Sequence, residues 1–134
     1  MATLHLFRGY PGSGKSSAAY RLFPNLVKFE NDMFLMRDGK YCWTKESVKD
    51  AIAWCINSVK TALDNGMDVC VCNTFTKKKF VEAYAKIAAD RGANFEVYRC
   101  RGEFKNVHGL ADWMVSKFKT AMEDYPGEII VDPV

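Results

Sequence analysis

The sequence predicts a three-layer α/β/α fold around a parallel sheet of four to five strands. Short apolar runs of strand length alternate with longer segments of helical periodicity, an order typical of parallel strands joined by crossover helices. The run 68–73 (Asp-Val-Cys-Val-Cys-Asn) is apolar throughout its interior, as expected of a central strand covered on both faces. A glycine-rich turn directly after the first strand is the third observation, because parallel α/β sheets bind ligands beyond the carboxyl ends of their strands.

Capping residues, glycines and prolines set the expected ends of the elements. The expected strands are 3–8, 26–29, 68–73 and 94–100, with 128–131 as a further edge strand. The expected helices are 15–23, a long helix between Thr44 as N-cap and Gly66 as C′ residue, about 76–91 with Thr76 as N-cap, and about 110–124. The stretch between 30 and 43 is expected to be irregular, with an Asp38-Gly39 turn in a small hairpin between 34–36 and 41–43.

Length and composition indicate one soluble domain, residues 1–134. The chain is 49% apolar and 26% charged, an ordinary balance for a globular protein. No apolar run approaches the ~18 residues of a membrane span, and the N-terminus leads directly into a core strand, so we expect no membrane contact and no targeting peptide. Five cysteines without a CxxC pair indicate a reduced, cytoplasmic compartment rather than disulfides or a zinc site. The net charge of +3 is too small to indicate nucleic-acid binding by itself.

Residues 9–16, Gly-Tyr-Pro-Gly-Ser-Gly-Lys-Ser, match the complete pattern of a phosphate-binding loop, GxxxxGK[ST]. A predicted strand precedes the loop and a predicted helix follows it, which is the context the motif requires. The glycines let successive N–H groups and the positive end of the helix point at phosphate oxygens. Lys15 is expected to bridge the β- and γ-phosphates, and the Ser16 hydroxyl to ligate Mg²⁺. The motif therefore predicts binding of a nucleoside triphosphate, ATP, with Mg²⁺.

Asp32 follows the second predicted strand and therefore projects over the same sheet edge as the loop. A carboxylate there could accept the proton of an attacking hydroxyl, a contribution of about 10²–10⁴ in rate. The alternative is that Asp32 caps the turn into the next segment. Glu30 lies closer to the strand body and is expected to be structural or to support the site indirectly.

Asn73 and Thr74 close the third predicted strand, where many P-loop enzymes carry an aspartate that orients Mg²⁺ through water. The Asn73 amide can still hydrogen-bond such a water, and Thr74 can contact the substrate or the γ-phosphate. The alternative is a threonine-rich N-cap for the next helix.

Basic residues surround the same edge. Lys77, Lys78 and Lys79 open the third long helix, where cations oppose the helix dipole at about 0.3–1 kcal/mol each. They form either a solvated face or the seat of a phosphate-bearing substrate. After the fourth strand, Arg101, or else Arg99 or Lys105, could neutralise charge on the transferring phosphoryl group.

Two further features flank this edge. His108 could donate to a phosphate at the N-terminus of the last helix, or cap that helix. The aromatic residues Phe34, Tyr41 and Trp43 could stack on a nucleobase, or simply pack.

The segments GYPGSGKSS, ENDMF, NTFT and NVHG resemble, in that order, the small P-loop kinases and AAA-type ATPases related to the kinase domain of phage polynucleotide 5′-hydroxyl kinase. The resemblance runs from about Leu4 to Met122 and implies ATP-dependent transfer to a 5′-hydroxyl with Asp32 as general base. The nucleotide-binding residues are then Gly9, Gly12, Ser13, Gly14, Lys15, Ser16 and Ser17. The compact layout is also consistent with a phage origin.

The chain departs from that family at three places. Leu35 stands where the phage kinase domain has a phosphate-gripping arginine, with Arg37 nearby; Asn73 replaces an aspartate; and the arginine-bearing lid looks shortened. Three functions thus stay open: a polynucleotide kinase acting on a nucleic-acid 5′ end, a kinase for a nucleoside, sugar or antibiotic hydroxyl, and an ATP-binding switch that hydrolyses slowly.

Overall fold

A computed structural model describes residues 2–37, 40–41, 44–104 and 110–132. Its main sheet has five strands, all pairs parallel, in the order β2-β5-β1-β6-β7, and the predicted α/β/α fold is confirmed. These strands are β1 (Thr3–Arg8), β2 (Val27–Phe29), β5 (Val69–Asn73), β6 (Asn94–Cys100) and β7 (Ile129–Val131). A separate two-stranded hairpin pairs β3 (Met36–Arg37) with β4 (Lys40–Tyr41); a hairpin was predicted here, but between 34–36 and 41–43.

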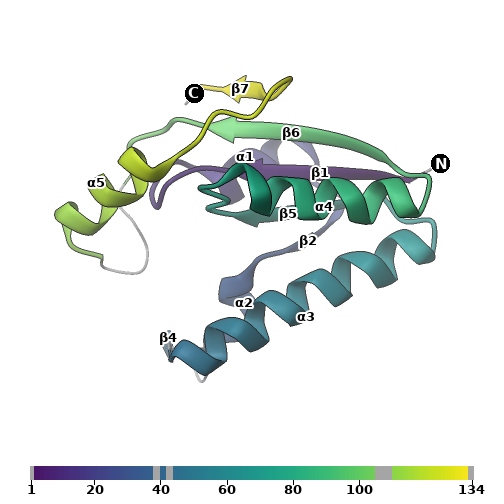
Figure 1. The fold of residues 1–134 in the computed structure, drawn as a ribbon, viewed down its shortest axis with the longest axis horizontal. Coiled ribbons are helices and arrows are strands. Elements are labelled where there is room, and N and C mark those ends of the chain that lie inside the picture. Colours follow the sequence, from purple (N-terminus) through teal and green to yellow (C-terminus); the bar gives the residue numbers. More distant parts are fainter. Residues whose placement is uncertain (1, 38–39, 42–43, 105–109, 133–134) are drawn as a thin grey trace.

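The helices lie on both faces of this sheet (Figure 1). They are α1 (Lys15–Leu22), α2 (Asn31–Leu35), α3 (Lys45–Asp64), α4 (Lys78–Asp90) and α5 (Asp112–Ala121). One core cluster joins α3 and α4 to one face of the sheet, and a second joins α1 to the opposite face. The turn that ends α3 has Gly66 in the left-handed region at φ 73°, as its predicted C′ role requires.

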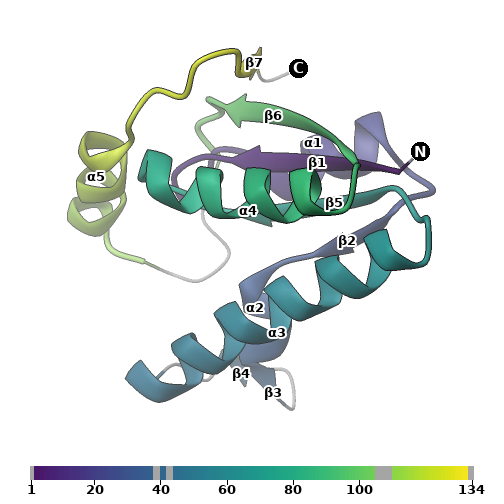
Figure 2. The same cartoon turned by 45° about the vertical axis from the view of Figure 1, so that its right-hand side comes forward.

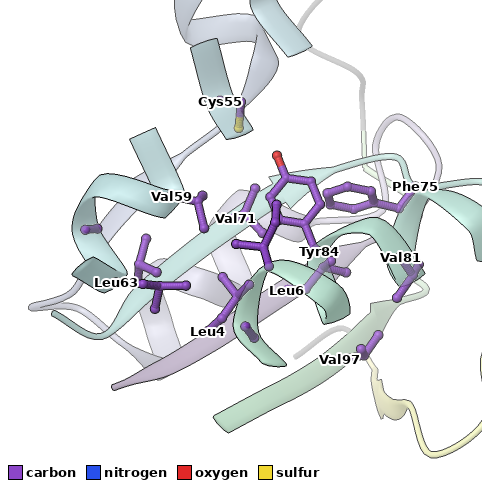
Figure 3. Packing of buried hydrophobic residues seen from close by; sticks show 14 residues of the cluster. Leu4, Leu6, Cys55, Val59, Leu63, Val71, Phe75, Val81, Tyr84 and Val97 are labelled. Atoms are coloured by element: carbon purple, nitrogen blue, oxygen red, sulfur yellow. The ribbon is translucent and has the colours of Figure 1, made fainter. Parts of the chain in front are cut away.

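Strand alternation explains the two clusters. Leu4 and Leu6 of β1 lie in the first cluster with Val71 of β5, whereas Phe7 and Cys72 lie in the second. Figure 3 shows the first cluster, in which the Tyr84 hydroxyl of α4 points toward the Cys55 sulfur of α3. Each fully buried side chain of this size stabilises the fold by about 1.5–3 kcal/mol.

Two expectations for the helices before α5 need correction. Residues 31–35 form the short helix α2, although this stretch was expected to be irregular. Helix α4 begins at Lys78 with Lys77 as its N-cap, so Thr76 does not cap it. The cap comes from far along the chain, because the Glu123 carboxylate accepts a 2.8 Å hydrogen bond from Lys78 N. A carboxylate at this end also offsets the helix dipole that the neighbouring lysines oppose.

Helix α5 is shorter than expected and lies apart from the main core, on the side toward which β1 and β6 point (Figures 1 and 2). None of its residues is buried. Its C-terminal end is attached through Glu123, whose N–H donates to Thr76 O at 2.7 Å, and through Lys77 Nζ, which donates to Ala121 O at 3.4 Å. Among the described residues, no helix has the length and apolarity that crossing a bilayer requires.

The N-terminus of α3 provides a direct test of local folding. The Thr44 hydroxyl accepts from Ser47 N at 3.0 Å, and Ser47 Oγ accepts from Thr44 N at 2.7 Å, a reciprocal capping box. We expect Thr44→Ala to lower the free energy of unfolding by about 1 kcal/mol in urea titrations followed by circular dichroism. Thr120→Ala, at an exposed hydroxyl within α5, is the control and should change it by less than about 0.5 kcal/mol. Equal losses would show that the box does not hold α3.

Candidate active site

The glycine-rich loop leads from β1 into α1 with the backbone that its motif predicts. Gly12 and Gly14 have φ values of 83° and 89°, in the left-handed region that glycine adopts without strain. Gly14 is the N-cap of α1; as a glycine it has no side chain that could accept from the first N–H groups of the helix, and the first turn holds no acidic residue. The positive end of α1 is therefore available to an anion.

The segment that follows β6 holds the loop in shape. Gly102 N donates to Ser13 O at 2.8 Å, and Phe104 N donates to Gly12 O at 2.7 Å. A Cβ on Gly9 would lie 2.9 Å from Cys100 O, so the loop approaches β6 too closely for a side chain there. Ser13 Oγ is buried without a hydrogen-bond partner among the described residues. The protein's own backbone hydrogen bonds thus define the shape of the loop.

Lys15 is the first residue of α1, and its Nζ donates to the Tyr10 carbonyl at 3.3 Å. Burial lowers the pKa of this amine, and the nearby carboxylates of Glu30 and Asp32 partly oppose the shift. Asp32 itself lies in the first turn of α2, two residues after Glu30. A bound phosphate would give the ammonium a charged partner in place of a neutral carbonyl.

The Ser16 hydroxyl donates to the Glu30 carboxylate, which lies directly after β2. Sequence reasoning assigned Glu30 a structural role, yet the structure places it against the residue predicted to ligate Mg²⁺. The available signal was its position at the carboxyl end of a strand, the same signal that selected Asp32. Two oxygen donors side by side are the type of ligand that Mg²⁺ prefers.

Asn73 and Thr74 join the end of β5 to both sides of this site. Asn73 Oδ1 accepts from Asn31 N at 2.8 Å, next to Asp32 in the first turn of α2. Thr74 O accepts from Gly9 N at 3.2 Å, at the start of the loop. The structure therefore brings Lys15, Ser16, Asn73 and Thr74 to one sheet edge with the Glu30–Asp32 segment.

Other predicted site residues have partners elsewhere. The Arg101 guanidinium pairs with Asp132 at 2.6 Å, beside β7. Arg99 pairs with Asp124 and Glu128. Lys77 holds the C-terminal end of α5, as described above. Ser17 is exposed on the first turn of α1.

The side chains of several predicted site residues lie outside what the structure describes. His108, Lys105 and Trp43 lie outside the described residues. Arg37 and Tyr41 are the last residues of β3 and β4, and their side chains lie outside what the structure describes.

Lys119 is a cation beside the loop that sequence reasoning missed. Its Nζ lies 4.8 Å from the centroid of the Tyr10 ring and pairs with both carboxylate oxygens of Glu103, at 2.8 and 2.9 Å. Lys119 is near the end of α5, and nothing in its sequence surroundings distinguishes it from Lys117. Lys119 is distinguished from Lys117 only by the position of α5, which brings the Lys119 side chain to the Tyr10 ring.

Because Lys15 is buried, we expect the substitution Lys15→Met to act in opposite directions on the free energy of unfolding and on the affinity for a polyphosphate. Without a ligand, Lys15→Met should leave the free energy of unfolding unchanged or raise it, because the charged amine is desolvated. The pKa of Lys15 is lower in the folded state than in the unfolded state. At pH values between these two pKa values the unfolded state binds more protons, so the free energy of unfolding of the unmutated protein should rise as the pH rises through this range. Urea titrations across this alkaline range should show the rise, and the Met variant should lack it.

The same variant should bind tripolyphosphate at least about tenfold more weakly in calorimetric titrations, because a charge-assisted hydrogen bond is lost. Lys79→Met, at an exposed lysine of α4, is the control and should retain both properties. Unchanged tripolyphosphate affinity in Lys15→Met would exclude the loop as the anion site.

Comparison with known proteins supports this fold assignment, and no protein-family model matches the chain. A presumed kinase from Chloroflexus aurantiacus superposes with a TM-score of 0.70 at 16% identity, over 98% of this chain and 88% of that one. A gluconokinase from Sinorhizobium meliloti gives 0.63 at 14% identity, over 98% and 82%. A chain of the Pnkp1/Rnl/Hen1 RNA repair complex gives 0.64 at 19% identity, over 94% of this chain but only 40% of that one. The fold is that of the P-loop kinases.

A relative by sequence is the uncharacterized protein PM0531 of Pasteurella multocida. It is 30% identical over 158 residues, an alignment that covers 100% of this chain and 85% of PM0531. The chain therefore belongs to the same family as PM0531, and it has a P-loop kinase fold.

Proposed function

We propose that this protein is a single-domain, ATP-dependent phosphotransferase that moves the γ-phosphate to a hydroxyl, foremost the 5′-hydroxyl of a polynucleotide. The observation that carries the proposal is the meeting of the loop with the acidic segment after β2. Ser16 contacts Glu30, and Asp32 follows two residues later in the first turn of α2, which Asn73 holds through Asn31 N. An ATP-binding switch would need the loop but not an acidic segment beside it.

The loop binds the polyphosphate in this proposal. The free N–H groups at the start of α1 and the Lys15 ammonium bind phosphate oxygens, with Lys15 releasing the Tyr10 carbonyl. Ser16 and Glu30 would hold Mg²⁺, with Glu30 supplying the carboxylate that Asn73 lacks. When bound, Mg²⁺ neutralises charge on the β- and γ-phosphates.

Asp32 acts as the general base. Its carboxylate accepts the proton of the acceptor hydroxyl as that oxygen forms a bond to the γ-phosphorus and the bond from the γ-phosphorus to the bridging oxygen of ADP breaks. Asn73, through Asn31 N, holds the first turn of α2 on which Asp32 lies. Positioning of this kind contributes to rate because the reacting groups are already oriented.

The second part of the proposal concerns the identity of the molecule that accepts the phosphate. The likeness to a chain of an RNA repair complex supports a polynucleotide, and the likeness to a gluconokinase supports a small hydroxylated molecule as the second candidate. Incubation with γ-labelled ATP, Mg²⁺ and a panel of 5′-hydroxyl RNA, 5′-hydroxyl DNA, nucleosides and gluconate distinguishes the two. We expect label on an oligonucleotide; label on a small molecule alone would favour the second candidate, and no labelled acceptor would refute phosphotransfer.

Substitutions of the two carboxylates should separate their roles. Asp32→Asn should lower kcat by about 10²–10⁴ while the affinity for ATP persists, because only the base is lost. Glu30→Gln should instead raise the Mg²⁺ concentration for half-maximal rate by at least about tenfold, as the loss of a charged ligand predicts. Asp50→Asn, at an exposed carboxylate of α3, is the matched control. Undiminished transfer by Asp32→Asn would remove it from this role.

Lys119, rather than Arg101, is proposed to neutralise charge at the transferring phosphoryl group. It lies beside Tyr10, whereas the Arg101 guanidinium faces Asp132. Lys119→Ala should lower kcat by at least about tenfold, at the modest end of what such cations contribute. Lys117→Ala, two residues away on the same helix, should leave kcat within about twofold. Equal effects of the two substitutions would indicate only a general dependence on positive charge.

A further inference from the structure

Arg8 is a fully buried charged residue at the carboxyl end of β1, the central strand of the sheet. Its guanidinium contacts two structures that are distant in sequence. Nε and Nη2 donate to Phe75 O at 3.0 and 2.6 Å, and Nη1 donates to Glu128 Oε1 at 2.8 Å. A buried charge is tolerated only with such a full set of partners. Arg8 therefore links the turn after β5 to the residue just before β7.

Phe75 is held in an unusual backbone conformation at this contact. It has φ 45° and is the sole non-glycine residue with a positive φ in the described ranges. A large side chain disfavours this region, so the surrounding structure must impose it. Two donors of Arg8 bond the Phe75 carbonyl, and the buried ring packs on Tyr84 at a centroid distance of 5.3 Å. Arg8 thus fixes the direction in which the chain leaves β5.

This direction matters because the two residues before Phe75 make the contacts of the candidate site. Thr74 O accepts from Gly9 N, and Asn73 Oδ1 accepts from Asn31 N, next to Asp32. A continuous set of contacts consequently runs from Glu128 through Arg8 and Phe75 to both the loop and the acidic segment. Neither Arg8 nor Glu128 itself belongs to those parts of the site.

We propose that Arg8, held by Glu128, is a positioning residue that orients Asn73 and Thr74 for reaction through the turn at Phe75. Its effect on rate rests on the proposed phosphotransfer; its effect on geometry does not. The inference also gives the C-terminal segment a role, because Glu128 accepts hydrogen bonds from Arg8, Arg99 and Tyr125 N.

Glu128→Gln tests the proposal with little change in shape, and Asp124→Asn is its matched control. Asp124 also pairs with Arg99, but its side chain is 92% exposed, and in the described contacts it reaches Arg8 only indirectly, through Arg99 and Glu128. Amide hydrogen exchange, measured by ¹⁵N NMR on the full chain, should accelerate at least about tenfold at Gly9 and Asn31 in Glu128→Gln. Exchange in the middle of α3 should change much less, and Asp124→Asn should leave all of these amides as they were.

The kinetic constants kcat and KM provide a second measurement, one that a mere loss of stability would not change in folded protein. At a temperature where each variant is fully folded, Glu128→Gln should lower kcat at least about tenfold and keep the KM for ATP within about twofold. Arg8→Lys, which keeps the charge but loses the planar fork, should show the same split. Unmoved exchange at Gly9 and Asn31, uniform acceleration across the fold, or wild-type kcat in folded Glu128→Gln would each overturn the proposal. If the unmutated protein phosphorylates no acceptor, the proposed function fails, and the exchange data still decide whether Arg8 positions the turn.

Discussion

The in-register pairing of β1 with both of its neighbours is the constraint on which the rest of the molecule depends. Arg8 pairs with Asn73 on one side and with Arg99 on the other, so three strands end at one level. Because all are parallel, the residues that follow them emerge at the same edge. The glycine-rich loop, the Asn73–Thr76 turn and the segment after β6 therefore meet without any helix having to place them. The backbone bonds from Gly102 and Phe104 to the loop are a direct consequence.

The two buried cations at this edge, Arg8 and Lys15, differ in how many hydrogen-bond partners the protein gives them. This difference distinguishes a structural role for Arg8 from a binding role for Lys15. Arg8 is fully buried with all of its described partners in place, which makes it a fixed part of the frame. Within the described ranges, the Lys15 ammonium has one hydrogen-bond partner, the Tyr10 carbonyl at 3.3 Å; its pKa is lowered by burial, and the first N–H groups of α1 lie beside it. Such a cation is held at a cost to the empty protein, and an anion relieves that cost. The contrast identifies the loop as a binding site and Arg8 as its support.

The sequence was sufficient for elements whose signals are local. The loop, the strands β1 and β5, and the Thr44 cap each depend on residues within one short segment, and each was predicted. Features that depend on distant partners were not. Glu123 caps α4 from beyond α5, and Lys119 reaches Tyr10 only because α5 docks there. Glu30 and Asp32 carry the same strand-end signal, so the sequence could not show that Glu30 is the one in contact with Ser16.

The attachment of α5 suits a helix that responds to ligand. None of its residues is fully buried, although Met114, Val115 and Phe118 are half-buried. Its described hydrogen bonds and ion pairs to the rest of the chain are those of Lys119 with Glu103 near the loop, and of Glu123 and Lys77 at α4. Exposed pairs of this kind each contribute about 0–1 kcal/mol, far less than an apolar core contact. In the proposed function, a polyphosphate on the loop would compete with Glu103 for the Lys119 ammonium. Because the polar attachment of α5 is weak, a small shift of this helix toward the ligand would cost little core contact.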